Sequence, residues 1–490
     1  MNSLPSDLAG LDVDELAPQT FSVEDENPFA TMMAGFDEAA DRIGLDPDVY
    51  TMLRNPDREI RVSLPTQLDD GRLAVFDGWR VQHNAGLGPY FGPLRLQRSL
   101  RVEELRAIAG WMTWKCAVLN IPFGGSAGGI RISPGRHTRG EVERVVRRYV
   151  ASMMADVGPD RDVFSSDVAT DEQIMAWIMD TVSMHERATQ NAVVCGKPMA
   201  LGGSHGHASS VAEGIRTLLV PALEFAGIAR RPARIIIQGA GMRGGNLASL
   251  LAQDGHRIIG LSDVHGALYN ADGLDVTSLL RHRAEYGSLR GAEGDFERIT
   301  NEEMLVKECE ALIPCAAAGT VHLRVARQLQ AAMIIEGAHG AVSSRADRIL
   351  AERKIRVVPD ILATGGGAVV NYFEWVQNRR GFNWDAQTVH SRLVGVMGDA
   401  WKEVSQLAQE QNCRLRPDAG GASRQQRGPL ARRVRLTQTS PERTQRRGAG
   451  ATPRLVPLRA RRQATFPLAV ISLPASMSPC ARVLWEHCYS

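Results

Sequence analysis

A glycine pattern in the second half of the chain has the residue types and spacing of a turn that binds a dinucleotide. Gly239, Gly241 and Gly244 form a G-x-G-x-x-G sequence between the β-branched run 234–238 and a helical stretch. Gly239 permits a tight turn, Gly241 lets the backbone approach a pyrophosphate, and Gly244 allows the helix to pack closely on the strand. The free N–H groups at the start of that helix would bind the anion.

Asp263 supplies the acidic residue that accompanies such a turn. It directly follows the next predicted strand, residues 257–262. A carboxylate at this place accepts a hydrogen bond from a ribose 2′-hydroxyl and repels a 2′-phosphate. The sequence therefore predicts a Rossmann domain that binds NAD, with NADP less favoured. The alternative is a Rossmann unit whose cofactor cleft has decayed.

A lysine and a glycine-rich strand lie close together in the first half of the chain. Apolar residues recur at helical spacing from Leu105 to Cys116 and put Lys115 beside the apolar stripe, near the end of the predicted helix. Segments 111–117 and 122–129 resemble the substrate site of the glutamate/leucine/phenylalanine/valine dehydrogenases. In that family a catalytic lysine stands at the position that Ala127 occupies here.

The resemblance covers about residues 35–416, with the motifs in the same order. Residues 334–340 and 358–367 are predicted as strands that end in glycine-rich loops on the nicotinamide side, and 371–378 resembles a helix that returns to the first domain. The family implies an α/β fold of two domains, an N-terminal mixed-sheet assembly and substrate domain and a Rossmann dinucleotide-binding domain.

The expected boundaries follow from these motifs. Alternating residues 60–65 and 73–81 flank Asp69-Asp70-Gly71 and predict a β-hairpin, and a helix is expected over 142–154. Residues 30–200 are predicted as the dimerisation and substrate domain, 201–370 as the NAD-binding Rossmann domain, and 371–416 as the returning helices.

The family reaction assigns roles to individual residues. Hydride passes from the α-carbon of an L-amino acid to NAD, and water attacks the resulting imine. By resemblance, Lys115 binds the α-carboxylate and Asp167 carries the proton of the amine. The alternatives are a helix lysine that extends to solvent and a carboxylate that caps the helix after it, Asp171 to Val182.

Ala127 removes the third element of this chemistry. A lysine buried among glycines has a pKa low enough to act as a base near neutral pH, and a methyl group cannot replace it. Arg131, the nearest cation along the strand, is about 13 Å away, and its guanidinium keeps its proton. Loss of one general base typically costs about 10²–10⁴-fold in rate.

Other positions in the same cleft also depart from the family. Phe91 occupies the place of the lysine that binds the side-chain carboxylate of glutamate, and Asn371 replaces a serine that assists it. What remains is an anchor, a carboxylate and an apolar wall, which suit an apolar amino acid. Further positions also differ from the usual residue of the family. Cys195 replaces a Thr, His339 and Thr364 each replace an Asn, Ala169 replaces a Gly, and residues 210–214 replace Ala-Thr-Gly-Arg-Gly.

Three functions remain open at this point. The first is a non-catalytic or regulatory subunit that assembles with itself or with an active paralogue and senses an apolar amino acid or NAD. The second is a working NAD-dependent dehydrogenase of apolar L-amino acids that recruits another base. The third is a damaged gene product that lacks its C-terminal helix and folds poorly.

The C-terminal segment has a foreign composition. Residues 413–490 hold 15 Arg, no Lys and three acidic residues, which leaves the preceding part at −10 within a net charge of +2. The segment 417–490 shows no helical or strand periodicity. We expect a frameshifted or otherwise non-homologous end that is disordered. The alternatives are a basic tail that binds nucleic acid or membrane and a plain disordered extension.

The remaining composition indicates the class of protein. The acidic N-terminus 1–26 has no pattern of a signal or transit peptide, and no apolar run approaches the 18 or so residues of a membrane span. Seven scattered cysteines favour reduced thiols and give no metal-ligand spacing. We therefore expect a cytoplasmic oligomer whose small-molecule ligand is an amino acid, with no metal, nucleic-acid or membrane partner.

Overall fold

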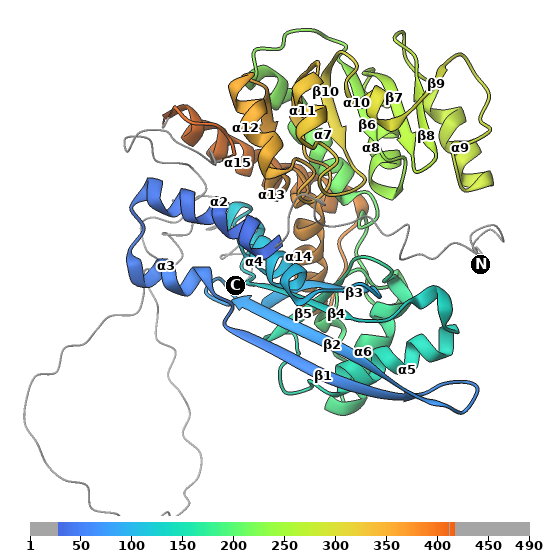
Figure 1. Ribbon diagram of the computed structural model, residues 1–490. Coiled ribbons are helices and arrows are strands. Elements are labelled where there is room, and N and C mark those ends of the chain that lie inside the picture. Colours follow the sequence, from blue (N-terminus) through green and yellow to red (C-terminus); the bar gives the residue numbers. More distant parts are fainter. Residues whose placement is uncertain (1–27, 411, 417–490) are drawn as a thin grey trace, which may run out of the picture. The chain divides into compact units, whose positions relative to one another are not determined.

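The chain folds around two mixed β-sheets (Figure 1). The computed structural model describes residues 28–410 and 412–416, so the N-terminus 1–27 and the predicted tail 417–490 lie outside the described residues. One sheet has five strands in the order β1-β2-β4-β3-β5, and the other has seven in the order β12-β11-β10-β6-β7-β8-β9. The predicted α/β class, with a mixed-sheet domain and a Rossmann domain, is confirmed.

The first sheet begins with the predicted hairpin. β1 (Arg58–Gln67) pairs antiparallel with β2 (Leu73–Asn84), and β2 pairs antiparallel with β4 (Gly125–Ile130). β3 (Tyr90–Leu96) then runs parallel to both β4 and β5 (Asp162–Ser166). Two further helices, α2 (Pro28–Ile43) and α3 (Pro47–Arg54), precede the sheet in the chain.

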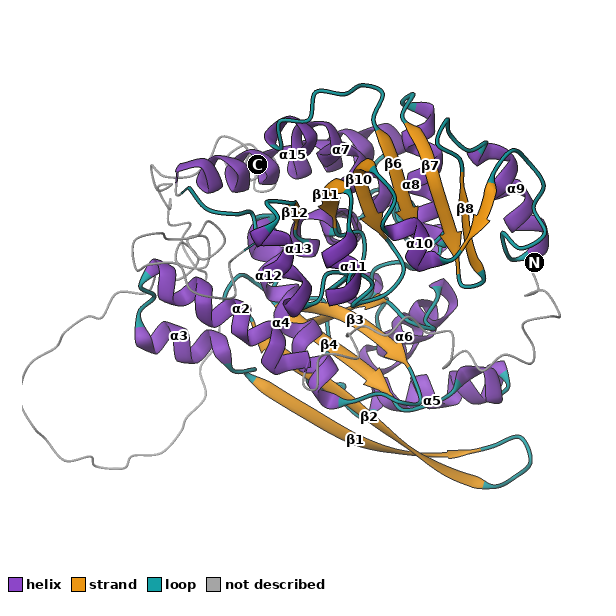
Figure 2. Ribbon diagram, turned by 45° about the horizontal axis from the view of Figure 1, so that its top comes forward, coloured by secondary structure: helices purple, strands orange, loops and turns teal. Residues whose placement is uncertain are grey.

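Helices cover both faces of this sheet (Figure 2). On one face, α4 (Val102–Val118) packs with Phe91 and Ala127. On the other, α5 (Arg139–Ala151) and α6 (Glu172–Glu186) pack with Leu94 and Ile130. The short helices η2 (Pro134–Arg136), η3 (Asn191–Val193) and η4 (Met199–Leu201) lie in the connections.

The glycines of β4 bring α4 close to the sheet. A Cβ on Gly125 would lie 2.2 Å from Thr113 Oγ1 and 2.3 Å from the Ala109 carbonyl oxygen, so only glycine fits there. Because successive strand residues face opposite sides, Ala127 points to the same side as Gly125, towards α4. The helix that carries Lys115 is thereby fixed over the strand that carries Ala127.

The second sheet is the predicted Rossmann unit. β6 (Arg234–Gln238), β7 (Arg257–Asp263), β10 (Cys309–Pro314), β11 (Ala331–Ile335) and β12 (Arg356–Val358) are parallel. β8 (Gly266–Tyr269) and β9 (Glu297–Ile299) extend the sheet antiparallel beyond β7.

Both faces of the Rossmann sheet are buried, which explains its continuous apolar strands. Ile235 and Ile237 pack with α7 (Ser210–Phe225) and α8 (Met242–Gln253), whereas Ile236 packs with the opposite layer. That layer contains α10 (Asn301–Leu305), α11 (Leu323–Gln328) and α12 (Ser344–Glu352). Helix α9 (Val276–Tyr286) contacts α8.

The returning helices begin earlier than predicted. The order is α13 (Asp360–Ala363), α14 (Gly365–Arg380) and α15 (Ala386–Glu410), so the predicted glycine-rich loop after Val358 is wrong. Its three glycines form the first turn of α14. The reason is tertiary, because a Cβ on Gly366 would lie 2.0 Å from the Ser210 carbonyl oxygen of α7. Glycine here serves close helix packing rather than a turn.

The helix predicted over 142–154 also shifts, to Arg139–Ala151. Thr138 caps it, accepting from the Glu141 N–H, while the Glu141 side chain accepts from the Thr138 N–H. This reciprocal cap sets the start of the helix before its first apolar residue.

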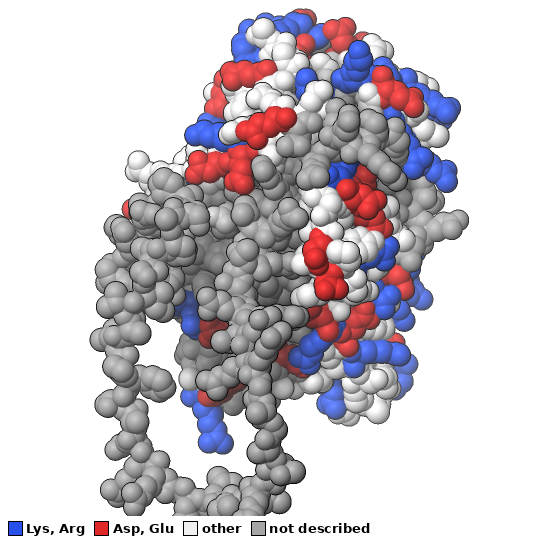
Figure 3. Space-filling view, turned by 90° about the vertical axis from the view of Figure 1, so that its left-hand side faces the viewer, with Lys and Arg blue, Asp and Glu red and all other residues white. Residues whose placement is uncertain are grey.

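On the face in Figure 3, acidic and basic side chains of the described residues are interspersed, so the electrostatic field of this face is of mixed sign.

Candidate active site

Lys115 lies in the last turn of α4 and is buried, with 4% of its surface exposed. Its Nζ donates to Thr364 Oγ1 at 2.8 Å and lies 3.4 Å from His339 Nε2. The alternative of a lysine that extends to solvent is therefore wrong. Burial lowers the pKa of Lys115 to about 8, with Asp360 opposing and Arg243 reinforcing the shift.

His339 lies against Lys115, after β11. Its ring stacks on Trp111 of α4, with 6.0 Å between centroids and 20° between planes. Its Nδ1 is 3.5 Å from Asp360 Oδ2, an ion-pair distance longer than most hydrogen bonds. Burial, together with the charge of Lys115, lowers the pKa of His339 to about 4, so the ring is neutral near pH 7.

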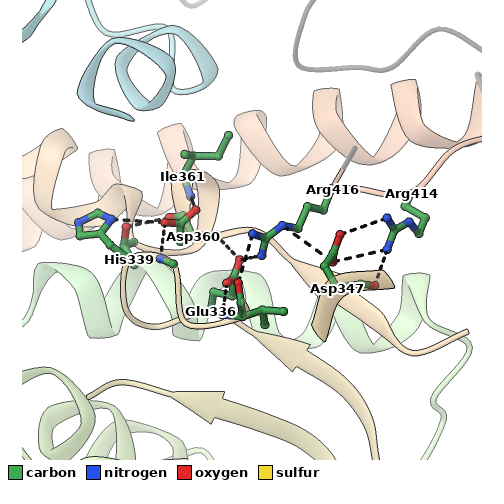
Figure 4. A network of polar contacts seen from close by, with 10 residues as sticks. Glu336, His339, Asp347, Asp360, Ile361, Arg414 and Arg416 are labelled. Carbon is green, nitrogen blue, oxygen red and sulfur yellow. Dashed lines mark hydrogen bonds and ion pairs between the residues drawn. The ribbon is translucent and has the colours of Figure 1, made fainter. Parts of the chain in front are cut away.

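Asp360 belongs to a chain of charged groups that continues through Glu336 to Arg416 (Figure 4). Its Oδ2 accepts from the Gly340 N–H at 3.0 Å, and its own N–H donates to Glu336 Oε2 at 3.2 Å. Glu336 in turn accepts from Arg416 at 2.8 Å. Burial acts to raise the pKa of Asp360, yet His339, Arg416 and Lys115 together hold it at about 2.

Asp167 lies directly after β5 and is held by Arg95 of β3, whose Nε donates to Asp167 Oδ2 at 3.1 Å. Burial acts to raise the pKa of Asp167, but Arg95 outweighs it and the pKa is lowered. The alternative role as a helix cap is wrong, because Asp171 caps α6. Ala169 adopts φ 54°, the left-handed conformation that the family's glycine accommodates without strain.

Ala127 and Phe91 form an apolar part of the same sheet face, and both are fully buried. Phe91 stacks on Phe123 with 4.8 Å between centroids, and Phe123 meets Tyr372 and Trp375 of α14 edge-on. Four aromatic rings therefore pack together beside this part of the sheet face.

Asn371 of α14 is also buried, with 8% exposed. Its backbone oxygen accepts from Cys195 Sγ at 3.2 Å, and its Oδ1 has no hydrogen-bond partner among the described residues. The side chain of Asn371 is thus a neutral carboxamide on α14, without a charge.

The predicted nucleotide turn has the required shape. Gly239 has φ 94°, and a Cβ on Gly244 would lie 2.0 Å from the Gly239 carbonyl oxygen. A Cβ on Gly241 would meet nothing within 4 Å, so this face of the turn is open. Gly241 is the N-cap residue before α8 and makes no side-chain cap, which leaves the first N–H groups of the helix available to an anion. These residues fit a pyrophosphate.

Asp263 ends β7 as predicted, and its carboxylate is held in place. Oδ2 accepts from Ser288 Oγ at 2.7 Å and from the Leu289 N–H at 2.6 Å, while Oδ1 accepts from the His265 N–H at 2.8 Å. Oδ1 therefore retains acceptor capacity for a ribose hydroxyl.

Sequence reasoning did not identify Arg243 or Asp360 as groups of the site, and it did not predict the contact of Trp111 with His339. Arg243 is half-buried in the first turn of α8, and its charge acts to lower the pKa values of Lys115, Asp167 and His339. Its position inside the glycine pattern was the available signal. Nothing in the sequence pairs Asp360 or Trp111 with His339, because these contacts join distant segments.

The described residues contain no cluster of His, Cys, Asp and Glu that could hold a metal ion. The described cysteines are free thiols, four of them buried: Cys116, Cys195, Cys309 and Cys315. No helix within residues 28–410 is long and apolar enough to cross a membrane.

Comparison with known proteins places the chain in a family. The model of the Glutamate/Leucine/Phenylalanine/Valine dehydrogenase family matches residues 202–426, and that of the Glu/Leu/Phe/Val dehydrogenase dimerisation domain matches 56–184. Glutamate dehydrogenase of Thermotoga maritima is 40% identical over 385 residues, which are 78% of this chain and 92% of that protein.

The chain belongs to the glutamate/leucine/phenylalanine/valine dehydrogenase family.

Other members of the family show the same extent of similarity. The catabolic NAD-specific glutamate dehydrogenase of Bacillus subtilis is 39% identical over 382 residues, covering 78% of this chain and 90% of that protein. A hetero-hexameric glutamate dehydrogenase of Thermus thermophilus, in a leucine-bound form, superimposes with a TM-score of 0.78 at 33% identity. It matches 86% of this chain and 100% of its own. Glutamate dehydrogenase of Peptoniphilus asaccharolyticus superimposes with a TM-score of 0.72 at 28% identity. The match covers 84% of this chain and 97% of that protein.

Proposed function

We propose that this chain is a catalytically impaired, NAD-binding subunit of the amino-acid dehydrogenase family that holds an apolar L-amino acid. One observation carries the proposal. Ala127 is fully buried on the sheet face beneath α4. By resemblance, this is the position of the family's catalytic lysine. A methyl group in a closed apolar setting neither accepts a proton nor stabilises developing charge.

The aromatic wall supports an apolar ligand. Phe91, Phe123, Tyr372 and Trp375 present rings where a side-chain carboxylate would need a cation. A buried carboxylate without a partner costs several kcal/mol, whereas an aliphatic side chain gains from the same surface. Lys115 remains as the anchor for the α-carboxylate, and Asp167 as the carboxylate beside it.

NAD is supported by the glycine turn, by Asp263 and by relatives that are named NAD-specific glutamate dehydrogenases. When bound, NAD would accept hydride from a substrate. Gly239, Gly241 and Gly244 would approach its pyrophosphate, and Asp263 its ribose. We further propose assembly with itself or with an active relative, because a solved relative is a hetero-hexamer. The free, buried thiols favour the reducing cytoplasm.

A second candidate is an active NAD-dependent dehydrogenase of apolar L-amino acids. The observation that favours it is His339, a neutral imidazole 3.4 Å from the Lys115 ammonium. An imidazole can accept a proton, which alanine cannot, although a pKa of about 4 makes His339 a weak base near pH 7.

Steady-state assay of the purified full chain tests the proposal. We expect NAD reduction with each of the twenty amino acids to be slower than the roughly 10 s⁻¹ of a typical enzyme by at least about 10²-fold. A127K should raise the rate with leucine before glutamate, and A127M, similar in size but without an amine, should not. Unmodified protein that turns over leucine at about 10 s⁻¹ contradicts the proposal. A fall of kcat in H339N at saturating leucine would then support the second candidate.

A further inference from the structure

Lys115 has two side-chain partners from distant segments of the chain. Thr364 and His339 both occupy positions where the family usually has asparagine, and both contact the Lys115 ammonium. Thr364 Oγ1 donates to the Asp360 carbonyl oxygen at 2.7 Å, so towards Lys115 it acts as an acceptor. The third N–H of the ammonium has no acceptor among the described residues.

The contact with Lys115 fixes the tautomer of His339. An ammonium only donates, so His339 Nε2 must accept and the ring proton must be on Nδ1, which faces Asp360. The charged groups that face this ring are Lys115 from α4, Asp360 from α13, Arg243 from α8 and Asp167 after β5. Two cations and two carboxylates therefore surround a neutral imidazole.

We propose that the carboxylate of an amino acid binds between Lys115 and His339, and that His339 takes up one proton as it binds. The inference rests on the proposed function only in that an amino acid binds at Lys115. The proton passes from the buffer to Nε2, which then donates to a carboxylate oxygen while Lys115 keeps its own proton. No other bond is made or broken.

Charge explains why His339 would take up a proton when the ligand binds. The free site holds His339 neutral, because burial and the Lys115 charge oppose an imidazolium. A carboxylate placed between the two groups offsets the Lys115 charge and offers an acceptor to Nε2–H. Asparagine, the usual family residue at this position, has no titratable group, so the coupling would be a property of this chain.

The size of the effect follows from two pKa values of His339. It is about 4 in the free protein. If the carboxylate restores the ordinary value of about 6.5, leucine should bind about 10-fold more tightly at pH 5.5 than at pH 7.5. About 0.9 proton should be taken up per leucine at pH 5.5.

Few other groups near the site titrate in this interval. Asp360 and Asp167 have lowered pKa values and stay ionised at pH 5.5. Burial lowers the pKa of Lys115 to about 8, which by itself changes leucine binding by less than about twofold over this interval. Burial raises the pKa of Glu336 to about 7, so this group also titrates in the interval. Because the control variant H339N keeps Glu336, the comparison with H339N subtracts its effect.

Calorimetry with the full chain tests the proposal. L-leucine is titrated at pH 5.5 and 7.5, in pairs of carboxylate-free buffers that differ in ionisation enthalpy, so that the protons taken up are counted. H339N is the matched control, because it restores the usual family residue and keeps Lys115, Asp360 and Glu336. Isoamylamine, which is leucine without its carboxylate, is the ligand control on unmodified protein.

The expected result is a 10-fold change in Kd and about 0.9 proton for unmodified protein, with less than a twofold change and no uptake at pH 5.5 in H339N. Isoamylamine should cause no uptake. Leucine binding without uptake, or uptake that persists in H339N, overturns this inference and leaves the proposed function intact. No binding of leucine, valine or phenylalanine at either pH contradicts both.

Discussion

Arg416 is the last described residue, and we predict that its loss destabilises the whole second sheet. Its guanidinium donates to Glu336 Oε2 at 2.8 Å and lies 3.9 Å from Asp347 Oδ1, as Figure 4 shows. The Glu336 side chain is fully buried, and that of Arg416 is only 24% exposed. Glu336 also accepts from the backbone N–H groups of Val342 and Asp360, so it holds the segment that carries His339.

The magnitude follows from the burial of the pair. R416M removes the charge and keeps much of the aliphatic stem, so it leaves Glu336 buried beside Asp360 without its cation. Breaking a buried pair from one side costs about 3–5 kcal/mol of unfolding free energy. Asp347 keeps its contact with Arg414 at 3.2 Å, which limits the loss to the Glu336 side of the network.

The loss should depend on pH. Burial raises the pKa of Glu336 to about 7 although Arg416 opposes it, and removal of Arg416 raises the pKa further. The ordinary pKa of a glutamate is about 4.3, so the folded state binds this proton more tightly than the unfolded state. Stability is therefore lost as pH rises, and R416M should be more impaired at pH 8.5 than at pH 5.5.

Urea unfolding of the full chain, followed by fluorescence, measures the effect. R379M is the matched control, because Arg379 forms an exposed pair with Asp160, where the expected loss is about 0–1 kcal/mol. E336Q combined with R416M should recover part of the stability, since the amide needs no cation. If the unfolding free energy of R416M lies within about 1 kcal/mol of that of the unmodified protein at both pH values, the reasoning is refuted.

Three further predictions concern the cofactor, acid stability and the chain end. D263A should abolish the preference for NAD over NADP in calorimetry, and unchanged preference would show that Asp263 does not face the ribose. His83 is buried and its pKa is lowered to about 4, so the folded state resists its protonation. Unfolding free energy should fall by about 2 kcal/mol between pH 7 and 5 from this residue, and the fall should be shallower in H83Q. A chain that ends at Arg416 should keep the thermal midpoint of the full chain, whereas one that ends at Cys413 should lose several degrees, because it lacks both arginines of the network.

The local elements of the fold were predictable from the sequence. The nucleotide turn at 239–244 and the end of β7 at Asp263 stand where the pattern predicted them, because both depend on residues near each other in the chain. The apolar stripe of α4 likewise identified a helix with Lys115 near its end. Helix boundaries were less accurate. Gly365 to Gly367 look like a loop in sequence, and only the approach of α7 explains why they are helical.

Sequence patterns proposed four groups of the candidate site: Lys115, Asp167, Ala127 at the place of the family's base, and Phe91 at the place of its cation. The surroundings of these groups depend on contacts between distant segments. His339 and Thr364 follow Lys115 by 224 and 249 residues, and no local pattern pairs residues so far apart. Packing of α4 against these segments buries the ammonium and leaves it beside an imidazole. Burial and charge then set both protonation states, because pKa values respond to distance in space and not to position along the chain.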